Sequence, residues 1–360
     1  MLPRKLFDAM LMDVLSIPEL AGKEADPHKK GTYGLPVKLR LACCLYKYHK
    51  NIPWGMFYKL ANISASPLER WSDSFLRLYT DKYYDRDVHP PQSEQEIQTT
   101  LMKHDLMGQT GCLNMWDGVH IEWPNCPSGD KWKFQGKEGY PTVAFLIAGD
   151  GNGLIHECSQ AHPGTSNDLI MCHYSPLAQS MNTGVYATRT FELLKLDGSR
   201  VRVQGLYGIT DAGLHKWRIF TQPVSAKMTV DIWDKRLSKR QESVRKPGSE
   251  CIFRIMKKRI PSLMLGVHHM TLAEITHFMK FCCMLHNQIM HANGRSTIGE
   301  YEGDWIHVNL SRDDMLIERG SNAVRPVRFT APYRPPGPSH QYTIIRLLWK
   351  SSLAYLYGAY

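Results

Sequence analysis

The stretch YPTVAFLIAGDGNGLIHECSQA, residues 140–161, decides the fold class of this 360-residue chain. Two apolar runs, 140–148 and 154–161, flank the turn-forming residues GDGNG at 149–153. Gly, Asp and Asn adopt the left-handed backbone conformations that tight turns between strands require. The stretch therefore predicts a hairpin of two antiparallel strands.

Further strands and helices are expected on both sides of this hairpin. They are strands at 113–117 and 201–210 and helices at 166–179, 248–263 and 271–293. Ser166 or Asn167 is the expected cap of the helix at 166–179. A strand, a hairpin, a helix, a strand and two helices in this order are typical of a mixed sheet flanked by helices. We therefore assign residues 109–293 to one α/β domain.

The N-terminal part, residues 1–108, has helical patterns only. The expected helices span 37–48, 54–61, 67–79 and 93–107. Ser66 and Pro67 match the preferences for a helix cap and a first helical residue. The first three helices fit a helix-turn-helix at 37–79, but a helical bundle without a DNA-binding role gives the same pattern. The tail, residues 294–360, has no pattern that assigns it a role.

Positive charge is concentrated in one part of the chain. The formal net charge is +10, and residues 235–259 contain ten Lys or Arg against two acids, Glu242 and Glu250, a net +8. An excess of this size favours nucleic acid as a partner, although ribosome-like or membrane-surface binding fits the net charge equally well. A solvated basic helix explains the charge run at 235–259 as well as a binding role does. With DNA as the partner, the expected phosphate contacts are Lys235, Arg236, Lys239, Arg240, Arg245, Lys246, Lys257 and Lys258.

Nine cysteines without regular spacing predict reduced thiols in an intracellular protein. Three histidines and two cysteines match no standard zinc site, and ordinary hydrogen-bonded side chains explain them better. These are His120, His156, His162, Cys126 and Cys158. No apolar run reaches the roughly eighteen residues of a membrane span, and the charged N-terminus does not match a signal peptide. No membrane association is therefore expected.

Two aspartates continue the apolar faces of predicted strands. Asp117 follows Leu113 and Met115 on one face, and Asp211 stands in the same relation to the strand at 201–210. A carboxylate aimed at the edge of a core is costly unless it is hydrogen-bonded or binds a metal. For either residue alone, an aspartate that caps the next turn is the simpler interpretation.

Glu250 lies beside the apolar stripe of the helix predicted at 248–263, where an exposed ion pair with Arg254 would explain it. Two aspartates and one glutamate would nevertheless suit a two-metal phosphodiesterase. In such an enzyme, carboxylates hold two divalent cations that activate the attacking oxygen and stabilise the leaving oxygen. Oxygen ligands select Mg²⁺ or Mn²⁺ over zinc.

Several blocks of sequence resemble those of Harbinger-type (PIF/Harbinger) transposases and occur in the same order. They are DGVHIEW at 117–123 with NCP at 125–127 and GKEGYPT at 136–142, HPGTSNDL at 162–169, TDAGLHKW at 210–217, KRQESVRK at 239–246 with ECIFRIMKKRIPSL at 250–263, and CCMLHN at 282–287. Each block alone is modest, but together they form a specific pattern.

The resemblance implies an RNase H-like fold with a DDE catalytic triad. Asp117, Asp211 and Glu250 would then be the ligands of two Mg²⁺ (or Mn²⁺) ions in a DNA endonuclease and transposase. The resemblance also implies an upstream helix-turn-helix, terminal inverted repeats of DNA as substrate, a Myb-like partner protein and action in the nucleus; a homo-oligomer is a further possible partner. Asp168 is expected to stabilise a helix start, with an auxiliary role in the site as the alternative.

Two departures from the family pattern concern the glutamate block. Three residues, PGS at 247–249, separate the Arg-Lys pair from Glu250 where the family usually has two, and Arg254 stands where a glycine is usual. An extra residue inside a helix would rotate Glu250 by about 100°. An extra residue before the helix only lengthens a loop, which PGS resembles. The alternatives to a transposase are a simple nuclease without strand transfer and a catalytically impaired derivative that binds DNA or protein.

Overall fold

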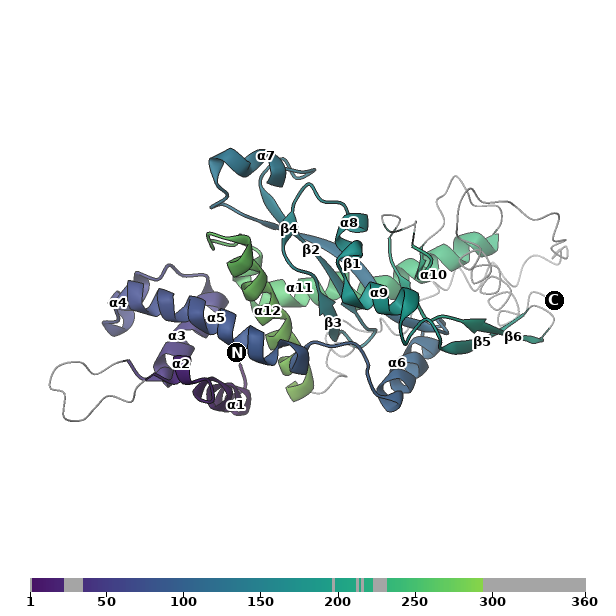
Figure 1. The fold of residues 1–360 in the computed structure, drawn as a ribbon, viewed down its shortest axis with the longest axis horizontal. Coiled ribbons are helices and arrows are strands. Elements are labelled where there is room, and N and C mark those ends of the chain that lie inside the picture. The colour runs from purple at the N-terminus through teal and green to yellow at the C-terminus, as the bar shows by residue number, and fades with distance from the viewer. Residues whose placement is uncertain are drawn as a thin grey trace, which may run out of the picture.

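The computed structural model describes residues 2–22, 35–195, 198–211, 214, 217–222 and 232–293. The tail predicted at 294–360 lies outside the described residues. Helices surround a central sheet in an elongated molecule, as Figure 1 shows. The helices are α1 Arg4–Leu15, α2 Pro18–Ala21, α3 Val37–Lys50, α4 Met56–Ala61, α5 Ala65–Asp87, α6 Glu94–Leu106, α7 Lys131–Phe134, α8 Asp168–His173, α9 Pro176–Thr183, α10 Ile232–Gly248, α11 Glu250–Arg259 and α12 Leu272–Asn293. Among the described helices, none is long and apolar enough to cross a membrane.

The central sheet is mixed. The strands are β1 Cys112–Glu122, β2 Thr142–Gly149, β3 Ile155–Cys158, β4 His162–Pro163, β5 Thr190–Leu194, β6 Arg200–Gln204, β7 Tyr207–Ile209 and β8 Phe220–Thr221. The strand order is β3-β2-β1-β7-β8, and β4 also pairs with β2. β2 is antiparallel to both β1 and β3, whereas β7 is parallel to both β1 and β8. The predicted mixed sheet flanked by helices is confirmed, with β1 at its centre.

The hairpin predicted from residues 140–161 is formed by β2 and β3. The Asp150 carboxylate closes its turn by accepting hydrogen bonds from the backbone N–H groups of Asn152 and Leu154, at 2.9 and 2.8 Å. Gly153 has φ +78°, a left-handed conformation that glycine adopts without steric cost. The residues that predicted the turn are therefore those that form it.

Two predicted strands differ from those observed. The strand predicted at 113–117 extends to Glu122, so Asp117 lies within β1 rather than at its end. The strand predicted at 201–210 is two strands, because Gly205, at φ +92°, separates β6 from β7. β6 pairs with β5 in a separate two-stranded sheet, and only β7 joins the central sheet. Both halves keep the period of two, so alternation alone does not distinguish them.

Helix boundaries also differ from the predicted ones. α5 begins directly after Ser64 rather than after Ser66, and it is longer than predicted. The helix predicted at 166–179 is divided into α8 and α9. Asn167, one of the two expected caps, accepts a hydrogen bond from the α8 backbone, and Ser175 caps α9 in the same way. The second cap explains why the chain begins a new helix within the predicted range.

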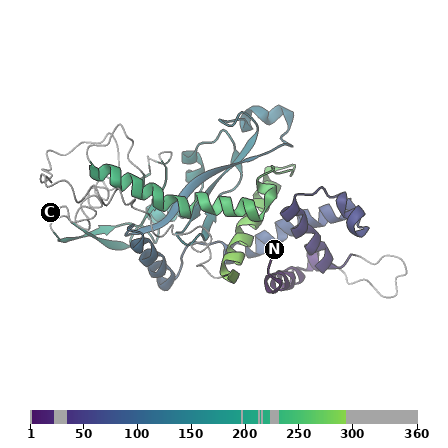
Figure 2. The same ribbon diagram turned by 180° about the vertical axis from the view of Figure 1, so that it is seen from behind.

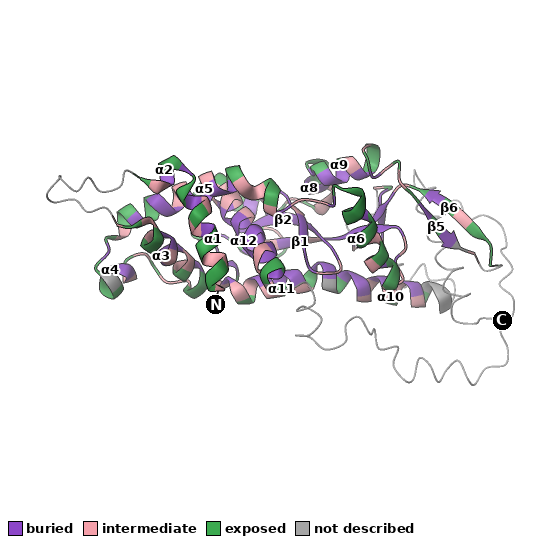
Figure 3. Ribbon diagram, turned by 90° about the horizontal axis from the view of Figure 1, so that it is seen from below, coloured by how far each residue is buried: buried purple, intermediate pink, exposed green. Residues whose placement is uncertain are grey.

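Buried side chains pack on both faces of the sheet. One cluster joins Val119 and Phe145 to α11, α12 and the N-terminal helices. A second cluster joins Leu146 to α8 and α9, and it also includes Val244 of α10. Figure 3 shows α8 and α9 on one side of the sheet and α10 and α11 on the other. Residues two apart on a strand share a face, so Asp117 faces the same side as Val119.

Helices α3, α4 and α5 span the range predicted as a helix-turn-helix, and α5 packs along α12. The rings of Phe75 on α5 and Phe281 on α12 meet edge to face, with centroids 5.2 Å apart. A hydrogen bond of 2.7 Å joins Tyr48 Oη on α3 to Ser72 Oγ on α5. The N-terminal helices therefore share a core with the sheet. A DNA-binding role for these helices and a domain boundary at residue 108 stay predictions.

Gly149→Ala is expected to destabilise the fold by about 1–3 kcal/mol. A Cβ at Gly149 would lie 2.4 Å from Ile252 Cδ1 and 2.6 Å from the Gly248 carbonyl oxygen, so α10 and α11 would have to move away from the sheet. Urea unfolding measures the loss. The control is Gly129→Ala, where the added Cβ meets nothing within 4 Å and the expected change is below about 0.5 kcal/mol. Equal stability of the two variants would contradict this close packing.

Candidate active site

Asp117 lies on the central strand of the sheet, and Asp211 follows the end of the neighbouring strand. Asp117 stands on β1, level with Ile147 of β2. On the other side of β1, the parallel register pairs Met115 with Ile209 of β7. Asp211 follows Ile209 by two residues, as Asp117 follows Met115, so the two aspartates come at equivalent positions after this pair. Neighbouring strands are roughly 4.8 Å apart, so this register brings both carboxylates to one place on the sheet.

Glu250 reaches the same place from the helical layer. It is the first residue of α11, and only Ser249, with φ −138° and ψ −67°, separates it from α10. Figure 2 shows α10 and α11 crossing the sheet almost end to end. Gly248 lies against Met115, because a Cβ there would be 2.2 Å from the Met115 sulfur. The close approach sets Glu250 near Asp117.

The segment PGS at 247–249 is not the loop that its composition predicts. Pro247 and Gly248 are the last two residues of α10, and a single residue forms the break before α11. The Ser249 hydroxyl donates a hydrogen bond of 2.9 Å to the Arg245 carbonyl oxygen within this break. The extra residue is thus absorbed between two helices, so neither of the two expected placements, inside one helix or in a loop, is observed.

Arg245 is buried and forms ion pairs with three carboxylates. Arg245 Nη2 lies 2.7 Å from Glu250 Oε1 and 3.4 Å from Glu242 Oε2. Arg245 Nη1 lies 3.6 Å from Asp117 Oδ1. The Arg245 side chain is 8% exposed, against 20% for Asp117 and 45% for Glu250. The guanidinium therefore occupies the space between strand and helix where the predicted ligands meet.

The charges of these groups act on one another. Burial is the main reason why the pKa of Asp117 is raised from its ordinary value of 3.8 to about 6. Arg245 opposes that rise, whereas the negative charges of Asp211, Glu250 and Asp168 add to it. Burial also lowers the pKa of Arg245, but its acidic neighbours raise it by more, so the guanidinium stays charged. Four carboxylates thus form one cluster, which we call the acidic cluster.

Asp168 joins the acidic cluster as the first residue of α8. A Cβ at Gly118 would lie 2.6 Å from Asp168 Oδ1, so the missing side chain makes room for this carboxylate beside β1. Burial raises the pKa of Asp168, and Asp211 raises it further, while Lys137 opposes the rise. Asp168 therefore stands at a helix start, as expected, beside the face of β1 opposite to Asp117. Its charge still acts on Asp117, and an auxiliary role in chemistry stays a prediction.

The basic stretch divides into residues inside and outside the site. Arg245 was expected to contact DNA phosphates, but its guanidinium is buried against carboxylates instead of facing solvent. Arg240 Nε donates a hydrogen bond of 3.0 Å to the Met107 carbonyl oxygen. The remaining expected contacts are the exposed Lys235, Lys239, Lys246 and Lys258 and the partly buried Arg236 and Lys257. Their contact with phosphate stays a prediction.

The donor chemistry of the acidic cluster suits a hard divalent cation, which prefers carboxylate oxygens. In the part of the chain that the structure describes, no three His, Cys, Asp or Glu side chains are placed as a ready metal site. Arg245 supplies the positive charge among the carboxylates as they stand. A metal ion would therefore have to replace its guanidinium beside Asp117 and Glu250. All nine cysteines are free thiols.

Arg245 and Glu242 are the site residues that sequence reasoning did not identify. Arg245 was grouped with surface cations because charge counts carry no information on burial. The position of Arg245 in the helix, relative to its apolar neighbours, indicates that it is buried. Leu237, Gln241 and Val244 are buried on α10, and Arg245 lies one turn after Gln241. This spacing places Arg245 on the buried face of the helix.

A family model described as plant transposon protein matches residues 86–297, more than half of the chain. The matched range contains the central sheet, helices α10 to α12, Arg245 and all four residues of the acidic cluster. No curated protein and no solved structure matches the chain.

Proposed function

The chain belongs to the plant transposon protein family, and from this premise we propose that it is a Harbinger-type DNA endonuclease and transposase with a DDE mechanism. The central sheet would be its RNase H-like core. Three antiparallel strands and two strands parallel to the central one support this assignment. The acidic cluster on the central strand would be the catalytic centre.

The observation that supports this function most is the crowding of carboxylates around Asp117. Burial and three neighbouring acids raise the pKa of Asp117 to about 6, against the effect of Arg245. Bringing like charges together out of water is costly without a cation, and perturbed acids of this kind gather at functional sites. A cluster of this composition on a central strand therefore favours a cation-assisted reaction over a purely structural role.

In the proposed mechanism, Asp117, Asp211 and Glu250 would hold two Mg²⁺ or Mn²⁺ ions. Such ions supply activation of the attacking oxygen and stabilisation of the leaving oxygen of a phosphodiester. Asp117 has to be ionised to act as a ligand, so binding weakens as the pH falls below about 6. Asp168, whose carboxylate occupies the space beside Gly118, would help to position the other groups of the site. Water would be the nucleophile of cleavage, and a DNA 3′-hydroxyl that of strand transfer.

The substrate and partners follow from the same proposal. Terminal inverted repeats of DNA would be the cleaved sites, in the nucleus, with a Myb-like protein and further copies of this chain as partners. The exposed lysines on α10 and α11 would contact the phosphates outside the acidic cluster. Helices α3 to α5 would act as the helix-turn-helix.

Lys246→Gln is expected to weaken DNA binding and to reduce its dependence on salt. Each phosphate contact contributes about 0.9 to the slope of log K against log salt concentration. The slope should therefore fall by about that amount, as measured by fluorescence anisotropy with a labelled duplex over a range of salt concentrations. Lys5→Gln removes an exposed charge from α1 and serves as the control. Identical slopes for Lys246→Gln and wild type would remove this residue from the DNA interface.

A plasmid-nicking assay tests the proposed activity. Wild-type protein is compared in Mg²⁺, in Mn²⁺ and in EDTA, beside Asp211→Ala. We expect nicking by the wild type with either metal, no nicking in EDTA, and a loss in the variant. The absence of cleavage by pure wild-type protein, even with a DNA-binding partner supplied, would refute the enzyme.

A second candidate is a transposase derivative that binds DNA or protein without cutting. The contacts of Arg245 with Asp117 and Glu250 favour it, because they satisfy the acids without a metal. The extra residue before Glu250 also favours this non-cutting candidate. Retention of a DNA duplex by wild-type protein that nicks nothing would support this candidate over the enzyme.

A further inference from the structure

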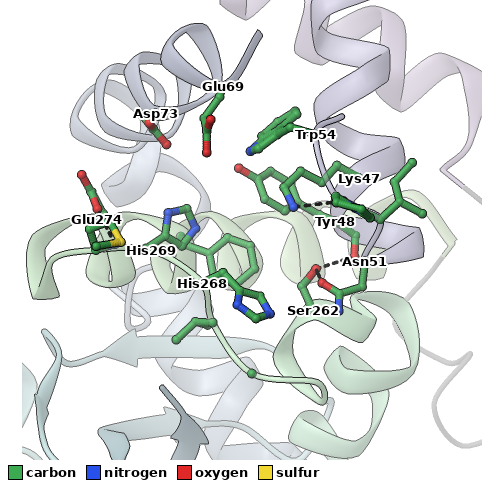
Figure 4. A pocket seen from close by; sticks show the side chains of 16 residues that line it. Lys47, Tyr48, Asn51, Trp54, Glu69, Asp73, Ser262, His268, His269 and Glu274 are labelled. Atoms are coloured by element: carbon green, nitrogen blue, oxygen red, sulfur yellow. Dashed lines mark hydrogen bonds between the residues drawn. The ribbon is translucent and has the colours of Figure 1, made fainter. Parts of the chain in front are cut away.

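A cavity of about 390 Å³ lies between the N-terminal helices and the segment that enters α12, and no residue of the acidic cluster lines it. Figure 4 shows side chains from α3, α5, α12 and the segment 266–270 around one space. Its volume is in the range of ligand-binding pockets. Unlike the chain as a whole, which carries +10, the cavity is lined by three carboxylates and one lysine.

The three carboxylates are Glu69, Asp73 and Glu274. Glu274 is engaged by the protein, because it accepts hydrogen bonds from the backbone N–H groups of Met270 and Thr271 at the start of α12. Burial, with the charges of Glu274 and Glu69, raises the pKa of Asp73 to about 6. Negative charge is thus held partly out of water on one wall of the cavity.

The basic groups that line the cavity neutralise this wall only in part. Lys47 attracts the charge of Glu69, but its Nζ donates a hydrogen bond to the Ile52 carbonyl oxygen at 3.2 Å and lies 4.9 Å from the centroid of the Trp54 ring. Burial lowers the pKa of His269 to about 4, so this imidazole is neutral. One face of the His269 ring packs on Phe278, with centroids 5.2 Å apart. Figure 4 shows His269, Glu69 and Asp73 facing the same space.

A metal ion is not the occupant that this cavity favours, because one of its three carboxylates, Glu274, is already held by backbone N–H groups. The walls beside the carboxylates are instead aromatic, from Tyr48, Trp54 and Phe278. Aromatic faces next to carboxylates suit an organic cation, because the rings attract the charge and pack against an aliphatic stem.

We propose that this cavity binds the cationic side chain, lysine or arginine, of a partner protein. The ammonium or guanidinium would lie between Asp73 and Glu69, and the stem would pack on Trp54 and Tyr48. The site is separate from the acidic cluster, so it does not depend on the proposed nuclease activity. A binding protein derived from a transposase would use it equally well.

Blocked tripeptides test the site on the full-length chain by calorimetry. The probes are Ac-Gly-Lys-Gly-NH₂ and Ac-Gly-Arg-Gly-NH₂, with Ac-Gly-Gln-Gly-NH₂ as the neutral control. We expect at least one cationic peptide to bind about tenfold more tightly than the neutral one, which is the effect of a charge-assisted hydrogen bond. Non-specific electrostatic attraction between peptide and protein does not explain such a preference, because the chain carries a net charge of +10.

Substitutions of the lining carboxylates test whether the cationic peptide binds in the cavity. Asp73→Asn should weaken the cationic peptide about tenfold, and Glu69→Gln should weaken it in the same direction. Asp85→Asn removes an exposed carboxylate from the same helix and should leave affinity unchanged. Equal affinity for all three peptides, or equal affinity of Asp73→Asn and Asp85→Asn for the cationic one, would overturn the proposal. Displacement of the peptide by Mn²⁺ in an Asp73-dependent manner would overturn it in favour of a metal site.

Discussion

Replacing Asp117 by asparagine is expected to lower metal-dependent DNA cleavage by about 10³-fold or more. Metal ions contribute several kcal/mol to the stabilisation of charge in the transition state, and each 1.4 kcal/mol or so is a factor of ten in rate. In the proposed two-metal site Asp117 is the central carboxylate, so its loss would weaken the binding of both ions. The asparagine has the same shape but not the charge, which keeps the packing around β1.

The same substitution is expected to stabilise the folded protein at pH 7 by about 1–2 kcal/mol, allowing for partial exposure. The pKa of Asp117 is about 6 in the folded chain and 3.8 is its ordinary value, so the folded state binds this proton more tightly. Its ionisation therefore costs stability as the pH rises from about 4 to about 6, and the full cost persists above that. The gain from asparagine should vanish below about pH 4.

Urea unfolding at several pH values and nicking rates measure the two effects. Glu122→Gln, at the exposed end of the same strand, removes one charge as well and should change neither. Opposite effects on activity and stability are typical of residues kept for function. An Asp117→Asn protein that cleaves DNA like the wild type would rule out Asp117 as a ligand. A protein that is less stable at pH 7 would indicate a structural carboxylate.

Arg245→Met is expected to destabilise the metal-free protein by about 1–3 kcal/mol, less than the roughly 3–5 kcal/mol lost when a fully buried pair is broken, because Asp117 and Glu250 are 20% and 45% exposed. Arg245 lies 2.7 Å from Glu250 and 3.6 Å from Asp117. Methionine fills similar space without the charge, so the carboxylates would repel one another unopposed. Saturating Mn²⁺ should restore most of the lost stability, because the ions would take over as counter-charge.

Thermal unfolding with and without Mn²⁺ measures this effect, and Lys246→Met, one residue further on an exposed position, is the control. Lys246→Met should be within about 0.5 kcal/mol of the wild type in both conditions. If Mn²⁺ stabilises Arg245→Met no more than the control, the acids do not form a metal site. If the substitution itself costs nothing, the contacts of Arg245 with the carboxylates contribute no stability.

The sequence predicted the parts of the fold that local chemistry determines. GDGNG specifies a turn through residues such as Asp150, whose carboxylate bonds to its own turn. Asn167 specifies a helix start in the same local way. The division between β6 and β7 was missed, because partners distant in the sequence decide which sheet a strand joins. Gly205 was the local sign of that division, and it has a left-handed φ.

The candidate site was predictable in its acids but not in its cation. Asp117 and Asp211 follow apolar strand patterns, and the parallel register then makes them neighbours. Glu250 was identified by resemblance, since nothing in its own helix distinguishes it from an exposed glutamate. The partner expected for it was Arg254, four residues on. The observed partner at 2.7 Å is Arg245 in the preceding helix, because the break at Ser249 turns the two side chains toward each other.

The central claim is that Asp117, Asp211 and Glu250 form a divalent metal site, and calorimetric titration with Mn²⁺ tests it without knowledge of the DNA target. We predict saturable binding by the wild type that weakens as the pH falls below about 6, since the proton on Asp117 competes with the metal. Asp211→Ala should lose this binding and Glu122→Gln should keep it. Mn²⁺ binding that is equal in wild type and Asp211→Ala, or no binding at any pH, would contradict the account.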